Sequence, residues 1–312
     1  MTHSPQISVI VCAHNPRSDY LRRVLEALRI QSLRKDEWEV LLVDNASSEP
    51  LSAAWDLAWH PAARHIREDE LGLTAARLRG IRESRGALLV FVDDDNVLDA
   101  DYLETARDIA SSVPQIGAFG ASTRGEFDVP PPEWIVPHLD GLAICELAQD
   151  HLSYAPGWSL ATPYGAGLCV RRAVADDYAE KASTTPLRKI LGRTGARLGA
   201  GEDSDLAWCA IDIGMGTGRF CSLRLTHLIP GERLTEAHVI RLQAGFAASE
   251  EIAAVLRPDR PVRKRASWRR KAALLVEWLR TSGLERKILV ASYRAREDAR
   301  KTISAELGGG LK

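Results

Sequence analysis

The chain has 312 residues, of which 45% are hydrophobic and 27% charged, as is typical of a globular protein with one large or two small domains. Its 41 Lys and Arg nearly balance its 42 Asp and Glu, so the formal net charge is -1. No overall positive field would draw nucleic acid to such a chain, and we expect no nucleic-acid partner.

Hydrophobic residues recur with two alternating periods in the first hundred residues. The pattern predicts strands at 7–13, 38–47 and 87–95 and helices at 19–33 and 73–86. Strands that alternate with helices pair in parallel through right-handed crossovers. The sequence therefore predicts an α/β fold, with a layered, mostly parallel sheet flanked by helices.

Each predicted strand ends on a cluster with polar residues. The first ends on Ala13, His14 and Asn15, the second on Asp44 and Asn45, and the third on Asp93, Asp94, Asp95 and Asn96. Ligands bind beyond the carboxyl ends of the strands in such sheets. We therefore expect these polar residues to face one crevice.

Three consecutive carboxylates, Asp93, Asp94 and Asp95, repel one another unless a positive group lies between them. They could cap the helix predicted at 99–110, although later aspartates can do so without them. A calcium loop is disfavoured, because Leu98 stands where such a loop needs a glycine. A divalent metal held by Asp95, and by Asp93 through water, would instead bridge a diphosphate and neutralise charge developing on it.

The chain is less regular from about 117 to 190. Consecutive prolines in 127–141 forbid a regular helix, and glycines mix with aromatic residues in 157–172 before a strand-like exit. Long loops of this kind are usually functional. After them, Gly201 leads into a predicted helix whose first turn holds Glu202 and Asp203.

Six segments, in this order and spacing, resemble the family-two glycosyltransferases with the GT-A fold: VIVCAHN, LLVDNAS, LGLTAARLRGI, LLVFVDDDN, PYGAGLCVRR and GEDSDLAW. The resemblance covers roughly residues 7–235. It implies inverting transfer of a sugar from a nucleotide diphosphate donor, with a UDP-sugar favoured. It also implies a manganese or magnesium cofactor and a glycan or lipid-linked acceptor.

The resemblance also implies roles for single residues. Asp93 and Asp95 match the D-x-D motif, Asp44 matches the aspartate that contacts the nucleobase, and Arg77 matches a basic residue near the diphosphate. Glu202 and Asp203 match the acidic pair whose aspartate is usually the base, and His227 matches a metal-ligating histidine. The implied donor site comprises Ala13, Asn15, Asp44, Arg77, Asp93 and Asp94, the metal site Asp93, Asp95 and His227, and the catalytic pair Glu202 and Asp203.

The chemistry of inverting transfer needs the same groups. A carboxylate must take the proton of the acceptor hydroxyl, and a cation must stabilise the leaving diphosphate. Each residue also has a simpler explanation. Glu202 and Asp203 could complement a helix dipole, Arg77 could be an exposed helix charge, and His227 could be a hydrogen-bonded core histidine.

Two features of the sequence depart from the family pattern. Leu78 replaces an asparagine near the donor. Ala13-His14 replaces a threonine-tyrosine pair, so the sequence does not determine which nucleotide the donor carries. A nucleotidyltransferase is a rival interpretation, although the chain lacks glycines after its first strand. A non-catalytic GT-A-like protein that binds glycan or acts as a scaffold is the other alternative.

The predicted boundary lies near residue 257. Residues 1–256 would form the catalytic domain, with a donor half at about 1–98 and an acceptor half at about 99–256, followed by a basic helical extension at 257–312. Trp134 and Trp158 could offer platforms to sugar rings or be buried in the core.

The extension suggests two arrangements. The basic residues are Arg263, Lys264, Arg265, Arg269, Arg270 and Lys271, and an apolar helical face with Trp268 and Trp278 accompanies them. The segment 263–290 could contact an anionic membrane surface, or the helix could dock on the catalytic domain.

The predicted compartment is the cytoplasm, with the inner face of the membrane as a further possibility. The five cysteines are odd in number and lack C-x-x-C spacing, as expected of reduced thiols (Cys12, Cys145, Cys169, Cys209 and Cys221). The N-terminus has no signal-peptide pattern, and no run of about 18 apolar residues predicts a membrane span.

Overall fold

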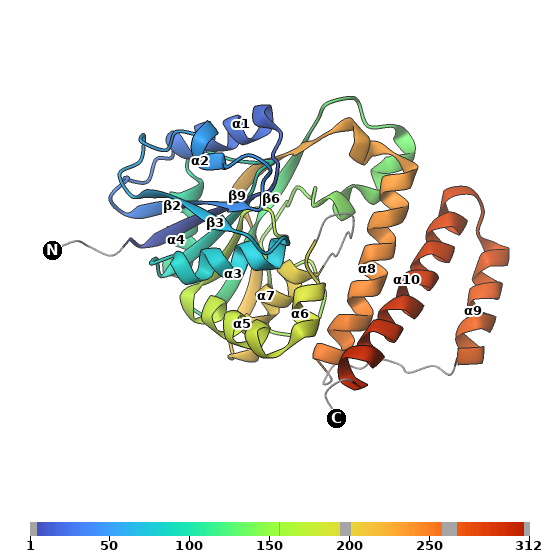
Figure 1. Ribbon diagram of the computed structural model, residues 1–312. Helices are drawn as coiled ribbons and strands as arrows, with labels where there is room; N and C mark the ends of the chain where they lie inside the picture. Colours follow the sequence, from blue (N-terminus) through green and yellow to red (C-terminus); the bar gives the residue numbers. More distant parts are fainter. Residues whose placement is uncertain (1–4, 156, 194–200, 258–266, 309–312) are drawn as a thin grey trace.

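The computed structural model describes residues 5–155, 157–193, 201–257 and 267–308 (Figure 1). Within these ranges the strands form one nine-stranded mixed sheet. Helices cover the sheet, and α8, α9 and α10 stand beside it in Figure 1. The predicted layered α/β architecture is confirmed.

The elements have the following bounds. The strands are β1 (Ile7–Ala13), β2 (Trp38–Asn45), β3 (Ala63–Glu68), β4 (Leu88–Asp93), β5 (Asn96–Leu98), β6 (Ile116–Phe127), β7 (His151–Ser153), β8 (Leu168–Arg171) and β9 (Gly216–Ile229). The α-helices are α1 (Ser18–Arg29), α2 (Leu51–Ala54), α3 (Leu73–Glu83), α4 (Tyr102–Ser112), α5 (Arg172–Thr184), α6 (Pro186–Ile190), α7 (Glu202–Asp212), α8 (Glu236–Leu256), α9 (Ser267–Arg280) and α10 (Gly283–Gly308), and the 3-10 helices are η1 (Glu133–Leu142) and η2 (Gly231–Leu234).

The strand order is β3-β2-β1-β4-β8-β6-β9-β5, with β7 also paired to β9. The first four strands in this order pair in parallel. Then β8 runs antiparallel to both of its neighbours, β6 pairs in parallel with β9, and β5 and β7 run antiparallel to β9. Parallel pairing therefore dominates the N-terminal half, and the other half is mixed.

The helices bury apolar faces on both sides of the sheet. Helix α1 buries Leu21, Val24, Leu25 and Leu28, whose spacing places them on one helical face. They join a core cluster that also includes α4, whereas a second cluster joins the opposite strand faces to α3, α5 and α7. The two cores hold the sheet between layers and fix its carboxyl edge.

Several strands lie where the sequence pattern predicted none. In β3 only Ile66 is buried, as suits an edge strand with charged residues. In β6, Gly120 faces Pro163, where an added Cβ would lie 2.7 Å from the proline Cβ. The glycine-rich segment 213–220 leads into β9. Charged residues in β3, and closely packed glycines in β6 and β9, therefore weaken the hydrophobic pattern that predicts a strand.

Helix α10 packs along α8. Ion pairs join the two helices, with Lys287 2.7 Å from Glu236, Arg296 2.7 Å from Glu250 and Arg300 2.6 Å from Glu251. Ile303 of α10 is buried in a cluster with Ile252 of α8 and residues of α6. This helix of the extension therefore docks on the body of the protein.

Helix α9 lies on the far side of α10 from the sheet (Figure 1). It exposes Leu275, Val276, Trp278 and Leu279. The basic residues Arg263, Lys264 and Arg265 lie outside the described residues, and of 267–272, including Trp268, only the backbone is described. No helix in the described part of the chain is long and apolar enough to cross a membrane.

Candidate functional site

The parallel register brings the polar ends of three strands to one edge. Ala13 pairs with Asp44 across β1 and β2, and Cys12 pairs with Asp93 across β1 and β4. The predicted crevice residues at these strand ends therefore lie side by side, because in-register parallel strands end together.

Asp44 fixes the loop that follows β2. Its carboxylate accepts hydrogen bonds from the Ser47 and Leu51 backbone N–H groups, both at 3.0 Å, and from the Arg67 guanidinium at 2.7 Å. Burial opposes ionisation, but these donors hold the pKa of Asp44 below its usual value. Asn15, at a positive φ of 45°, donates its N–H to Ser47 Oγ at 3.0 Å, so the two loops are joined.

Asp94 and Asp95 form the turn between β4 and β5. Asn96, the first residue of β5, pairs with His227 of β9 and donates its side-chain amide to Asp95 Oδ1 at 2.9 Å. The Asp95 carbonyl accepts the Leu228 N–H at 2.9 Å. This pairing places Asp95 beside His227, although the two residues are 132 positions apart in the chain.

Asp95 is buried against two basic side chains. Its Oδ2 lies 3.3 Å from His227 Nε2 and 3.0 Å from the Arg233 guanidinium. Burial opposes ionisation, but His227 and Arg233 hold the pKa of Asp95 well below its usual range. Burial and the neighbouring carboxylates raise the pKa of Asp94 to about 8, so this cluster lacks enough positive charge for all three aspartates.

Asp93 turns toward a different partner. Its Oδ1 lies 3.4 Å from Arg77, whose other guanidinium nitrogen donates to Glu202 Oε2 at 2.5 Å. Arg77 is only 1% exposed, so it is not the exposed helix charge of the simpler explanation. Gly165 lies against it, where an added Cβ would come within 2.7 Å of the guanidinium. Arg77 therefore bridges the end of β4 and the start of α7.

Glu202 and Asp203 begin α7 but have different surroundings. Glu202 is buried between Arg77 and Tyr178, whose hydroxyl donates to it at 3.3 Å, and burial raises the pKa of Glu202 to about 7 despite the attraction of Arg77. Asp203 is partly exposed, and its Oδ2 accepts the Gly165 N–H at 2.8 Å. Of the pair, only Asp203 is accessible to a bound molecule.

Residues 8–143 match the family described as Glycosyl transferase family 2. This match includes the ends of β1, β2 and β4 and the Asp93–Asp95 turn. Over these residues the chain is similar to glycosyltransferase family 2. The resemblance found in the sequence is thereby confirmed.

Related sequences match only a part of the chain. EpsH of Bacillus subtilis is 32% identical over 106 residues, covering 32% of this chain and 29% of EpsH. The glycosyltransferase AglE of Haloferax volcanii is 32% identical over 103 residues, covering 32% of this chain and 34% of AglE. The matches span between 12% and 34% of the length of the curated relatives.

Solved structures share the fold of this chain. A mannosyltransferase from Pyrobaculum calidifontis, in complex with GDP-Man and Mn²⁺, has a TM-score of 0.56 at 20% identity, covering 100% of this chain and 77% of that one. S. aureus TarS 1–349 with UDP-GlcNAc has a TM-score of 0.55 at 13% identity, covering 95% and 92%. The GT-A type of fold is confirmed.

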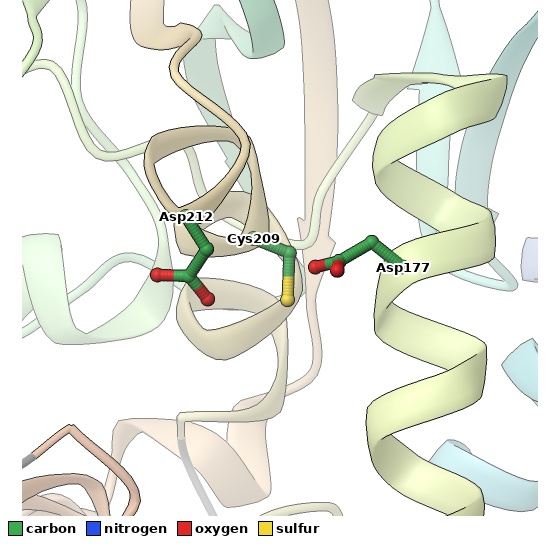
Figure 2. A group of neighbouring side chains, drawn as sticks. All are labelled: Asp177, Cys209 and Asp212. Carbon is green, nitrogen blue, oxygen red and sulfur yellow. The ribbon is translucent and has the colours of Figure 1, made fainter.

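The predicted metal ligands do not all lie together. Asp95 and His227 are in contact, but Asp93 pairs with Arg77 instead. A different group, Asp177, Cys209 and Asp212, places three potential ligand atoms within 4.8 Å of one another, and Figure 2 shows Asp177 reaching from α5 toward α7.

Cations of the protein already neutralise this second group. Lys181 lies 2.5 Å from Asp177 and 2.9 Å from Asp212, and Arg257 also pairs with Asp212. Arg257 further contacts Asp205 at 3.0 Å. The group is therefore an ion-pair network that ties the end of α8 to α7.

Sequence reasoning missed Arg233 and Arg67. Arg67 lies on the charged edge strand β3, and Arg233 lies in η2, six residues after His227. No period in the sequence marks either one, because each reaches its partner through strand pairing. The sequence allowed Trp134 and Trp158 to be either buried in the core or exposed at the surface. These residues are 37% and 62% exposed, which excludes burial in the core.

Proposed function

We propose that this protein is an inverting glycosyltransferase that moves a sugar from a nucleotide diphosphate to an acceptor hydroxyl. The observation that carries the proposal is the Arg77 bridge, which holds Asp93 at the donor edge and Glu202 beside the accessible Asp203. Donor carboxylates and a separate carboxylate for proton transfer therefore share one charged network, as such a reaction requires.

Asp203 is the proposed general base. Inversion requires the acceptor oxygen to attack the anomeric carbon opposite the departing diphosphate, while a carboxylate takes its proton. The Gly165 N–H, at 2.8 Å from Asp203 Oδ2, orients that carboxylate. Glu202 is too buried to touch an acceptor and acts through Arg77, which positions Asp93.

Asp95 and His227 are the proposed metal ligands, with Asp93 reaching the ion through water. Carboxylate oxygen and imidazole nitrogen suit Mn²⁺, and Mg²⁺ favours carboxylates. The fit is supported by His227 Nε2, which lies 3.3 Å from Asp95 Oδ2, and by the crowded aspartates. A bound cation would neutralise the negative charge that develops on the leaving diphosphate.

The remaining donor contacts are proposed from the same edge of the sheet. Asp44 would contact the nucleobase, Ala13 and Asn15 would line its pocket, and Asp94 would lie near the sugar. The solved relatives with UDP-GlcNAc and with GDP-Man support a nucleotide sugar. We favour a UDP-sugar donor.

The acceptor is proposed to be a glycan or a lipid-linked saccharide. Trp158 is exposed, and its ring centroid lies 6.1 Å from that of Tyr164, the residue before Gly165. An exposed aromatic ring near the base offers an apolar face to a sugar ring. Residues 1–98 would then serve the donor, 99–256 the acceptor, and 257–312 would carry the helical extension.

Nucleotide release tests the proposal. The purified protein is incubated with UDP- and GDP-sugars and glycan acceptors, with manganese or with a chelator, and the anomeric configuration of any product is read by NMR. Inverted product that needs metal supports the proposal. Nucleotide binding without release from any donor would favour the non-catalytic glycan-binding alternative, and a retained configuration would exclude inversion.

A further inference from the structure

The Asp95 carboxylate is shared by two basic side chains. Arg233 lies 3.0 Å from Asp95 Oδ2, His227 Nε2 lies 3.3 Å from the same oxygen, and the Arg233 and His227 nitrogens are 3.3 Å apart. The guanidinium therefore covers the carboxylate oxygen and the imidazole nitrogen that would hold a metal.

A metal ion and the guanidinium cannot both keep these positions. A divalent cation binds carboxylate oxygen at about 2.0–2.2 Å, and it would face the positive charge of Arg233 across a single oxygen atom. Like charges this close repel strongly in a buried site. Arg233 must therefore leave Asp95 before a metal can bind there.

The place of Arg233 in the fold allows it to move. It belongs to η2, a single 3-10 turn between β9 and α8, and its side chain is 26% exposed. The next residue, Leu234, is buried in the cluster beneath α8. The turn can thus stay fixed while the long arginine side chain changes its rotamer.

We propose that Arg233 and the divalent cation occupy Asp95 in turn, and that Arg233 transfers to the donor diphosphate when metal and donor bind. The proposal rests on the proposed function for its ligands. A guanidinium matches phosphate oxygens with two parallel hydrogen bonds. When Arg233 leaves Asp95, the diphosphate becomes its negatively charged partner. The positive and negative charges of the site therefore stay paired in both states.

Metal and nucleotide must then strengthen each other's binding. Metal alone has to displace Arg233 into solvent, whereas metal with nucleotide offers Arg233 a new partner. Such coupling is reciprocal, so each ligand tightens the other by the same factor. Without Arg233, the metal meets no competitor and the diphosphate loses a contact.

Binding of Mn²⁺ and UDP to the full chain tests this exchange. Free Mn²⁺ is measured by electron paramagnetic resonance, and UDP binding by calorimetry at saturating Mn²⁺. We expect Arg233→Met to bind Mn²⁺ alone about tenfold more tightly than the wild type and to bind UDP with Mn²⁺ about tenfold more weakly. Arg233→Lys should restore the competition for Mn²⁺ in part. Arg224→Met is the matched control, because this exposed arginine of β9 donates to the Cys221 carbonyl.

Each outcome decides the proposal. Equal Mn²⁺ affinity of the wild type and Arg233→Met overturns the exchange, even if sugar transfer is found. The exchange is also overturned if UDP binds tightly with the same affinity in the presence and absence of Mn²⁺ and this binding requires Arg233. The guanidinium would then stand in for the metal as the cation that binds the diphosphate. Sugar transfer absent from a protein that shows the Mn²⁺ exchange would instead contradict the proposed function alone. Thermal melting identifies a misfolded variant, in which case Arg233→Lys carries the comparison.

Discussion

Asp203 and Glu202 are adjacent residues with opposite environments. The sequence presents them as an equivalent acidic pair, yet Glu202 is 2% exposed, whereas Asp203 is partly exposed and its carboxylate accepts the backbone N–H groups of Gly165 and Ser204. A general base must reach the proton that it removes. The difference in solvent exposure therefore favours Asp203 as the general base and leaves Glu202 the role of holding Arg77.

Asp203→Asn should lower the turnover number by about a hundredfold or more while the donor KM changes little. An amide cannot take the acceptor proton, and proton removal belongs to the transition state and not to ground-state binding. Steady-state kinetics at saturating acceptor measure both constants. A normal turnover number, with an unchanged melting temperature, would return Asp203 to the role of helix-dipole partner.

Glu202 should make stability depend on pH. Burial raises its pKa from 4.5 to about 7, so between these values the folded protein holds a proton that the unfolded chain has released. The free energy of unfolding should then fall as pH rises through this window, by about 3 kcal/mol at most. Urea unfolding in a chelator, from pH 4.5 to 7.5, measures the slope.

Glu202→Gln isolates this contribution. The amide keeps the shape of the side chain but does not titrate, so the slope in this pH window should flatten. Absolute stability should also fall, since Arg77 loses its 2.5 Å partner. An unchanged slope would mean that Glu202 is ionised throughout and that Arg77 compensates its burial.

At the scale of elements, the loop that carries Trp158 is held in a defined shape. Thr162 is fully buried, its hydroxyl accepts the Ser159 N–H at 3.1 Å, and its own N–H donates to the Ser159 carbonyl at 2.9 Å. Beyond it, Tyr164 lies under the Arg219 guanidinium, 4.3 Å from the ring centroid. A fixed loop that exposes a tryptophan is suited to binding a rigid ring.

Trp158→Ala should raise the acceptor KM about fivefold and leave hydrolysis of the donor unchanged. Stacking on an aromatic ring contributes roughly 1 kcal/mol, and water needs no platform. The measurement compares transfer with hydrolysis in one preparation, and Trp158→Phe should retain most of the affinity. Trp134→Ala is the control on another element. Equal losses in transfer and hydrolysis would place Trp158 on the donor side.

At the scale of the whole molecule, the described side chains of α9 include an exposed apolar group. Leu275, Val276 and Leu279 are 59%, 48% and 67% exposed. Removing the extension would be a poor test of this face, because it would also take away Arg257 and Ile303, which contact α7 and the α6–α8 cluster. Point substitutions on α9 avoid that damage.

We predict that the protein binds vesicles containing anionic lipid through α9, which would hold the active site near a lipid-linked acceptor. Replacing Leu275 and Leu279 together by glutamate should abolish sedimentation with the vesicles and leave the melting temperature unchanged, because both side chains already face solvent. Binding should also weaken with salt. Ile30→Glu, at an exposed residue beside α1, is the control. Equal recovery of all forms in the supernatant would contradict membrane contact.

The sequence by itself determined the α/β layer and the chemical character of its edge. Hydrophobic periodicity located β1, β2 and β4, and polar residues at their ends located the crevice, because these features depend on neighbours a few residues apart. The order of six segments also indicated the family. These local patterns can be recognised in the sequence without knowing which distant residues are in contact.

Only the tertiary structure decided which side chains meet. The strand β9 returns through pairing with β5 and brings His227 and Arg233 to Asp95, while α7 brings Glu202 to Arg77. Glu202 is buried and Asp203 is partly exposed, although the two residues are adjacent in the chain. Arg77, which could have been a surface charge by its sequence, is buried between Asp93 and Glu202. These outcomes depend on residues more than a hundred positions apart, and no local period in a sequence records such contacts.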